Sequence, residues 1–271
     1  PRAYPQRRMW IHHQFDPRST AYHVPLVLRM SGRVDLARLR KAVDEVVAAH
    51  AVLRTVHPDS PSGPRQRRIE HRSPVLRHRL VDAATGPEGL RRDIDDFLRR
   101  PFDLESETGF RAAVFELDSA EDPHTHLAVV LHHVAIDGWS IRVLLTDLLR
   151  AYDGQRLSVP ADEAFTYADF TQWQIARLGD PSDPRSRYAR QLRFWTSTLA
   201  EAPGPLRLPG IADTGGRPRD AAAGRLSASI VGTDSLHQTA KAMSASVFQV
   251  AHAALATVLG RWTGEWDLLI G

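Results

Sequence analysis

Residues 132–138 read His-His-Val-Ala-Ile-Asp-Gly and follow an apolar run, HLAVVL, over residues 126–131. The run is short, rich in β-branched residues and uninterrupted, so it predicts a buried strand. Because side chains alternate between the two faces of a strand, His132 and His133 are expected to point in opposite directions. With a turn at Gly138 and helical periodicity after it, this stretch predicts a titratable imidazole at the edge of a cleft.

Hydrophobic periodicity places this strand–turn–helix unit in a mixed α/β (α+β) fold. Apolar residues at three- and four-residue steps predict helices, and short β-branched runs predict strands. Strands are expected at residues 22–30, 111–117, 126–133 and 225–231. Helices are expected at residues 34–49, 87–98, 187–199 and 246–261, and from Trp139 to near Gly154, which is predicted to end that helix.

The 271-residue chain is long enough for one large or two modest domains, and one turn-rich segment is expected to divide it. Residues 179–184 (GDPSDP) are rich in turn-forming residues and predict a boundary between lobes. The first lobe is expected over residues 1–178 and the second over residues 185–271. Residues 203–224 contain proline and glycine and lack periodicity, so they predict a long loop within the second lobe.

The composition excludes several classes of function. Apolar residues make up 42% and charged residues 25%, as in an ordinary globular protein, and the net charge is only +3. Lysine occurs only at Lys41 and Lys241, and no basic run is interleaved with aromatic residues as in proteins that bind single-stranded nucleic acid. The chain has no cysteine, which excludes disulfides, thiolate nucleophiles and cysteine metal sites. No apolar stretch approaches the ~20 residues that span a membrane.

Motifs along the chain resemble those of the condensation-domain superfamily, which includes nonribosomal peptide synthetase condensation domains, chloramphenicol acetyltransferase and coenzyme A-dependent acyltransferases. The HHVAIDG stretch at residues 132–138 resembles the signature of the superfamily. The other matching segments occur in family order: residues 6–10 (QRRMW), 50–55 (HAVLRT), 101–104 (PFDL) with Phe110-Arg111, 167–170 (YADF) with Trp173-Gln174, Phe194-Trp195 with Leu199, and Leu206 with Leu208-Pro209.

The resemblance implies a chloramphenicol acetyltransferase-like two-lobe fold, with a mixed sheet, flanking helices and a substrate tunnel between the lobes. It implies an enzyme that joins a donor acyl or peptidyl thioester to the amine of an acceptor aminoacyl thioester. Peptidyl carrier proteins upstream and downstream would deliver both substrates on phosphopantetheine arms, and the domain itself would bind no cofactor. We further expect a neighbouring adenylation domain, a monomeric domain in the cytoplasm, and no nucleic-acid or membrane partner.

Both ends of the chain are expected to be internal to a longer polypeptide. The sequence starts Pro1-Arg2-Ala3-Tyr4, without an initiator methionine or a signal-peptide pattern. Residues 266–271 (WDLLIG) resemble a family strand and stop where the family continues. The second lobe is therefore expected to be truncated, and the fragment on its own is expected to be inactive if the tunnel lacks one wall.

His133 is the leading catalytic candidate, because peptide bond formation needs a neutral amine placed against a thioester carbonyl. A free α-amino group has a pKa of roughly 7.7–8.0, so much of it is already neutral near pH 7. We therefore expect His133 to position the amine by a hydrogen bond, with proton acceptance secondary. His132 is expected to be structural and to orient the neighbouring backbone.

Asp137 allows three interpretations: an acid that orients His133, a helix N-cap, or half of a buried ion pair. The resemblance points to the ion pair, with an arginine beyond Gly271; without it Asp137 would be a buried, unpaired carboxylate. Gly138 either permits close substrate approach and offers its N–H to a developing oxyanion, or is a simple turn glycine. Trp139 and Ser140 are expected at the substrate tunnel, and DGWS resembles domains that accept L-configured donors.

Other functions are less favoured by the sequence. The pair His12-His13 has no Asp-Gly companion and is expected to be incidental. A zinc site built from His124, His126 and the 132–133 pair lacks cysteines or an HExxH pattern. The chain has no GxSxG elbow, P-loop or GxGxxG after a strand. The alternatives that stay open are a stand-alone acyltransferase that uses coenzyme A or a soluble acceptor, and a non-catalytic domain that recruits another protein.

Overall fold

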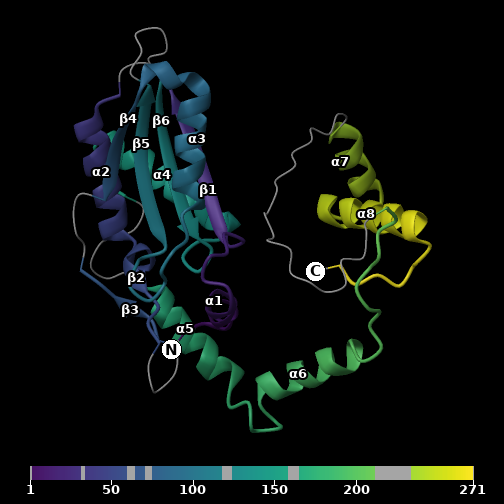
Figure 1. Cartoon of the computed structure of the whole chain (residues 1–271). Helices are drawn as coiled ribbons and strands as arrows, with labels where there is room; N and C mark the ends of the chain where they lie inside the picture. Colours follow the sequence, from purple (N-terminus) through teal and green to yellow (C-terminus); the bar gives the residue numbers. More distant parts are fainter. Residues whose placement is uncertain are drawn as a thin grey trace. The chain divides into compact units, whose positions relative to one another are not determined.

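The computed structural model describes residues 2–31, 34–59, 65–70, 75–117, 124–157, 165–210 and 233–270. The chain divides into two compact units, Pro1–Leu178 and Gly179–Gly271, which are described separately (Figure 1). Helices and strands alternate through the first unit, and this mixture confirms the predicted α/β (α+β) class.

A four-stranded mixed sheet forms the centre of the first unit, in the order β1-β6-β5-β4. The strands are β1 (His23–Met30), β4 (Leu76–Val81), β5 (Phe110–Leu117) and β6 (Thr125–His132). β6 pairs antiparallel with β1 and β5, whereas β4 runs parallel to β5. The register sets His132 opposite His23, so the predicted histidine pair begins at the end of a central strand.

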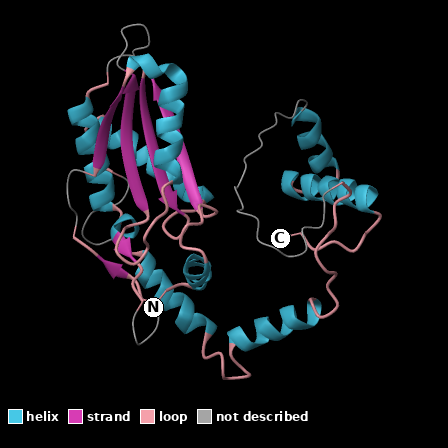
Figure 2. Ribbon diagram, viewed as in Figure 1, coloured by secondary structure: helices cyan, strands magenta, loops and turns pink. Residues whose placement is uncertain are grey.

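Helices cover both faces of this sheet (Figure 2). On one face, α2 (Leu36–Ala49) and α4 (Gly138–Tyr152) share an apolar core with alternate residues of the central strands, such as Val114 and Val129. On the other face, α3 (Gly86–Arg99) packs against the residues between them, such as Phe115. The alternation of apolar residues toward both faces explains why β5 and β6 are buried almost throughout.

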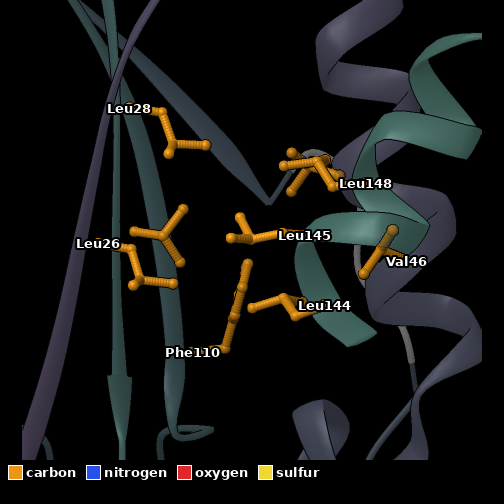
Figure 3. Close-up of a pocket in the computed structure, with 9 residues that line it drawn as sticks. Leu26, Leu28, Val46, Phe110, Leu144, Leu145 and Leu148 are labelled. Carbon is orange, nitrogen blue, oxygen red and sulfur yellow. The ribbon is translucent and has the colours of Figure 1, made fainter. Parts of the chain in front are cut away.

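Apolar side chains line a pocket in the core between the sheet and the α2–α4 pair (Figure 3). A small apolar cavity of about 20 Å³ lies there, among Leu26 and Leu28 of β1, Phe110 of β5, and Leu144 and Leu148 of α4. That volume is close to the space of one water molecule, and the side chains around it offer no polar partner. We therefore interpret it as a packing defect of the core.

Local signals set the ends of the helices in this layer. Asp35 caps α2 by accepting a hydrogen bond from the N–H of Arg38 at 3.0 Å, so the helix begins two residues after the predicted start. Gly154 adopts a left-handed conformation with φ +71° just after α4, as the sequence predicts. His50, after α2, bonds the buried Asp147 of α4 at 2.8 Å and ties the two helices together.

Further elements of the first unit surround the end of the sheet where β6 stops. They are α1 (Tyr4–Phe15), η1 (Ala51–Arg54), the antiparallel pair β2 (Thr55–Val56) and β3 (Arg67–Arg68), and α5 (Tyr167–Leu178). The short η2 (Ala83–Thr85) lies at the opposite end of the sheet, between β4 and α3. The Arg54 guanidinium donates to the carbonyls of Val47 and Ala48 at 3.1 and 2.9 Å, which satisfies the end of α2.

In the second unit, the described residues form α6 (Arg187–Thr198), α7 (Thr233–Ala242) and α8 (Val247–Thr263). The predicted strand 225–231 and most of the predicted 203–224 loop lie outside the described residues. The predicted strand at the chain end is wrong, because residues 265–270 are irregular. A strand needs a hydrogen-bonded neighbour. The ring of Trp266 packs against Gly260 of α8, and a Cβ added to Gly260 would lie 2.7 Å from that ring.

Single helices within the described part of the chain are too short or too polar to meet the criteria for crossing a membrane. The bent pair α7 and α8, which turn by 101° between them, meets the criteria jointly by length and composition.

α8 begins at a capping box formed by Ser246 and Gln249 and ends at Gly264, whose φ is +79°.

Candidate functional site

The histidine pair lies where β6 ends and the chain turns toward α4. His132 is buried, with 3% of its surface exposed, whereas His133 is exposed. The two side chains therefore have opposite environments, as the alternation of side chains along a strand predicts. This arrangement leaves one imidazole packed behind the strand end and the other available to a ligand.

Backbone hydrogen bonds from both neighbouring strands fix the turn at residues 132–135. The His132 N–H donates to the Gly109 carbonyl at 3.0 Å, and the His133 N–H donates to the Tyr22 carbonyl at 2.8 Å. The Ala135 N–H closes the turn on the His132 carbonyl at 2.9 Å. A Cβ added at Gly109 would lie 3.3 Å from the Cβ of His132, so this close approach favours glycine.

Side chains hold the next residue of the turn, Val134. Its N–H donates to Nδ1 of His132 at 3.1 Å, and its carbonyl accepts from Nε2 of Gln6 at 3.1 Å. Because Nδ1 of His132 accepts a hydrogen bond, its ring carries the proton on Nε2. His132 therefore acts on the backbone that follows His133, which supports the structural role predicted for it.

Aromatic and imidazole rings enclose His132. The centroid distances from its ring are 6.0 Å to Tyr22 and Phe102, and 6.4 Å to His13 and His23. Burial, and next the neighbouring histidines, lower the pKa of His132 from 6.5 to about 3. His132 is therefore neutral at ordinary pH. α1 thus places the ring of His13 near His132, and the expectation that the His12-His13 pair is incidental to the chemistry stays a prediction.

Asp137 is the N-cap of α4. Its Oδ1 accepts hydrogen bonds from the N–H and Oγ of Ser140 at 2.9 and 2.6 Å, and these bonds hold its pKa below the usual range. Its side chain is exposed, and within the described residues it has no ion pair and no hydrogen bond to His133. The expectation of a buried carboxylate is therefore wrong for this structure, because the start of a helix at the surface satisfies the acid locally.

The remaining predicted site residues lie in the first turn of α4. Gly138 is the first residue of the helix, and an added Cβ would meet no atom within 4 Å, so the space beside it is open. Trp139 is 81% exposed, whereas Ser140 is half-buried beside Asp137. The structure thus brings Asp137 and Ser140 together with His133 and leaves Trp139 pointing to solvent.

A pocket of about 290 Å³ opens beside His133. Apolar groups from α1, η1 and the turn form most of its wall, and polar groups from the turn, α4 and α5 face the same space. The lining residues are Pro5, Gln6, Met9, Val52, His133, Val134, Ala135, Ile136, Asp137, Ser140 and Tyr167. An apolar wall with a few converging polar groups is typical of a site that binds and orients a small organic ligand.

The sequence assigns no role to two of these residues, Gln6 and Tyr167. Gln6 lies in the QRRMW segment and Tyr167 in the YADF segment. The presence of a polar side chain in a family motif is the one sequence signal that could have identified them. Burial, and next the charge of Asp137, raise the pKa of Tyr167, so its hydroxyl stays protonated and able to donate a hydrogen bond. Gln6 is 2% exposed and bonds to a residue 128 positions away, a contact that no local pattern predicts.

Among the described ranges, no group of three or more histidine, aspartate or glutamate side chains is placed to hold a metal ion. His132, the buried member of the pair, already uses its Nδ1 on the backbone.

A family model described as "Condensation domain" matches residues 3–271. The isonitrile lipopeptide synthase of Mycobacterium tuberculosis is 36% identical over 281 residues, which cover 100% of this chain and 11% of that protein. A dimodular nonribosomal peptide synthase of Bacillus subtilis is 31% identical over 277 residues, again 100% of this chain and 11% of the relative. The chain thus spans only a small part of the curated relatives that it matches.

Solved structures have the same fold. The X-domain in its complex with OxyB from teicoplanin biosynthesis superposes with a TM-score of 0.75 at 25% identity, covering 97% of this chain and 57% of that one. The first condensation domain of the CDA synthetase gives a TM-score of 0.70 at 23% identity, covering 97% and 62% of the two chains. These similarities confirm the predicted chloramphenicol acetyltransferase-like fold.

Proposed function

This chain belongs to the condensation-domain family of nonribosomal peptide synthetases, and we propose that it forms an amide bond between two carrier-bound substrates. The donor is an acyl or peptidyl thioester, and the acceptor is the amine of an aminoacyl thioester. The observation that carries the proposal is the exposure of His133 beside a pocket of about 290 Å³, just after β6 and within the HHVAIDG stretch that resembles the family signature.

The proposed reaction makes one bond and breaks one. The acceptor nitrogen attacks the thioester carbonyl carbon, the C–N bond forms, and the C–S bond breaks to release the donor carrier's thiol. The proton lost by the amine ends on that sulfur. His133 accepts a hydrogen bond from the attacking amine and holds it in line with the carbonyl, and orientation of this kind contributes ~7–11 kcal/mol.

Gly138 is the proposed donor to the developing oxyanion. It is the first residue of α4, where helix N–H groups lack partners within the helix. Asp137 engages the Ser140 N–H, which keeps the cap in place without occupying the Gly138 N–H. The absence of a side chain at Gly138 leaves the space beside this N–H open to the substrate. Ser140 lines the pocket, whereas Trp139 is 81% exposed and would meet substrate outside it.

Membership in the family supports a wider proposal. We propose that residues 1–178 are the N-terminal acetyltransferase-like lobe and that residues 185–271 begin the C-terminal lobe. Upstream and downstream peptidyl carrier proteins would deliver both substrates on phosphopantetheine arms, with an adenylation domain adjacent in the polypeptide. The domain itself would be monomeric, need no bound cofactor, and work in the cytoplasm, in keeping with a chain that has no cysteine.

Carrier dependence tests this function. The complete domain that includes this chain is mixed with a loaded donor carrier and a loaded acceptor carrier, and intact-protein mass spectrometry follows transfer. A mass gain on the acceptor carrier, absent when the donor is a free coenzyme A thioester, is the expected result. Transfer from coenzyme A to a soluble amine would instead assign a stand-alone acyltransferase. Binding of a partner protein without any transfer would assign a recruitment domain.

A further inference from the structure

We propose that Gln6 is a positioning residue for His133 and acts through the backbone of Val134. This inference rests on the proposed function, in which His133 orients the acceptor amine. Gln6 is 2% exposed and lies in the first turn of α1, at the wall of the same pocket as His133.

The Gln6 amide has a fixed orientation. Its Oε1 accepts a hydrogen bond from the Ala3 N–H at 3.3 Å, as part of the capping arrangement that begins α1. With its oxygen engaged there, Nε2 points to the Val134 carbonyl, which it reaches at 3.1 Å. The start of α1 and the turn after β6 are thereby joined through one side chain.

The contact matters because of the peptide plane that it holds. The plane between Val134 and Ala135 is bound at both polar ends: its carbonyl by Gln6, and its N–H by the His132 carbonyl at 2.9 Å. The preceding plane, between His133 and Val134, is bound through the Val134 N–H by Nδ1 of His132. Two consecutive planes after His133 are therefore fixed, which restricts the direction in which its imidazole leaves the backbone.

Loss of the Gln6 donor would leave a buried carbonyl without its partner, because Val134 is only 4% exposed. A buried carbonyl without a partner is unfavourable, so the turn would rotate to find another donor or water. That rotation would move His133 relative to the rest of the pocket. A displacement of about 1 Å at a reacting group can cost about 100-fold in rate.

The test uses the complete domain with loaded carriers and three variants. Gln6→Met keeps the length of the side chain and removes the donor. Gln6→Glu donates to Val134 only while its carboxyl is protonated, and burial favours that form. Gln14→Met is the matched control, because Gln14 is an exposed glutamine on α1.

We expect Gln6→Met to lower kcat by roughly 10- to 100-fold with little change in KM, and Gln14→Met to match the wild type. Gln6→Glu should approach the wild type at low pH and lose activity as the pH rises. A wild-type kcat in Gln6→Met would mean that the residue only fills space and would overturn the inference.

A second measurement keeps this inference separate from the proposed function. Hydrogen exchange at the Ala135 amide reports on the turn without any substrate. We expect faster exchange in Gln6→Met and no change in Gln14→Met. Faster exchange with normal kcat, or lower kcat with normal exchange, would each overturn the inference. If the wild-type protein transfers nothing between carriers, the proposed function fails. The positioning role of Gln6 is tested separately: unchanged exchange at the Ala135 amide in Gln6→Met would overturn it.

Discussion

The guanidinium of Arg111 lies over the ring of Phe102, with its Cζ 3.9 Å from the ring centroid. Phe102 in turn meets the ring of His132 edge-on at a centroid distance of 6.0 Å. Arg111 is 7% exposed and binds both carboxylate oxygens of Glu107, at 2.5 and 2.6 Å, and the carbonyls of Arg100 and Pro101. A buried cation thus supports the side of the histidine pair that faces away from the pocket.

Replacement of Arg111 by alanine is expected to destabilise the first unit by about 3 kcal/mol or more, because Glu107 and two carbonyls lose a buried partner. Urea denaturation measures the free energy of unfolding. Arg92→Ala, at an exposed position of α3, is the control and is expected to change it by less than about 0.5 kcal/mol. Equal values for the two variants would contradict the supporting role of Arg111.

Acid is expected to destabilise the fold through its buried histidines. Burial lowers the pKa values of His132 and His57 to about 3, from an ordinary value of 6.5. Below pH 6.5 the unfolded chain binds more protons at these residues than the folded chain, so the free energy of unfolding falls as the pH drops from 6.5 toward 3. Each histidine contributes a slope of about 1.4 kcal/mol per pH unit in that range.

Variants distinguish this effect from the titration of acids. Asp103, Glu107 and Asp137 have lowered pKa values, so their contributions are lost mainly below pH 4.5. Urea denaturation between pH 6.5 and 4.5 should therefore give a shallower slope for His132→Gln and His57→Gln than for wild type. Identical slopes would mean that these histidines titrate normally in the folded protein.

The cap at Asp137 leads to a prediction that separates its geometry from its charge. Asp137→Asn keeps an oxygen acceptor for Ser140, and it should preserve both the stability and the transfer activity. Asp137→Ala removes the cap and is expected to cost about 1 kcal/mol in unfolding free energy. If Asp137→Asn is stable but inactive, the carboxylate charge is required, as in an ion pair or a triad.

The sequence predicts the local features of the site well. The apolar run before the histidine pair predicts β6, and the alternation of its side chains agrees with a buried His132 beside an exposed His133. Gly154 ends α4 as predicted, because the left-handed conformation after a helix favours glycine. These features depend on a few neighbouring residues, which is why single-chain patterns suffice for them.

Features that depend on distant contacts were not predictable in this way. The bond from Gln6 to Val134 joins residues 128 positions apart, and the His13–His132 contact depends on how α1 returns to the sheet. The exposure of Asp137 follows from tertiary position, not from its motif. The strand expected after residue 265 fails for a related reason, since pairing needs a neighbouring strand that the described part of the second unit does not offer.

The central claim is that His133 orients the acceptor amine in carrier-dependent amide formation. The most direct measurement is intact-protein mass spectrometry of donor transfer between loaded carriers, with wild type, His133→Ala and His237→Ala in the complete domain. His237 is an exposed histidine on α7 and serves as the matched control. We predict that His133→Ala lowers the rate at least about 100-fold while His237→Ala keeps it. Transfer at the wild-type rate by a folded His133→Ala protein would contradict the claim.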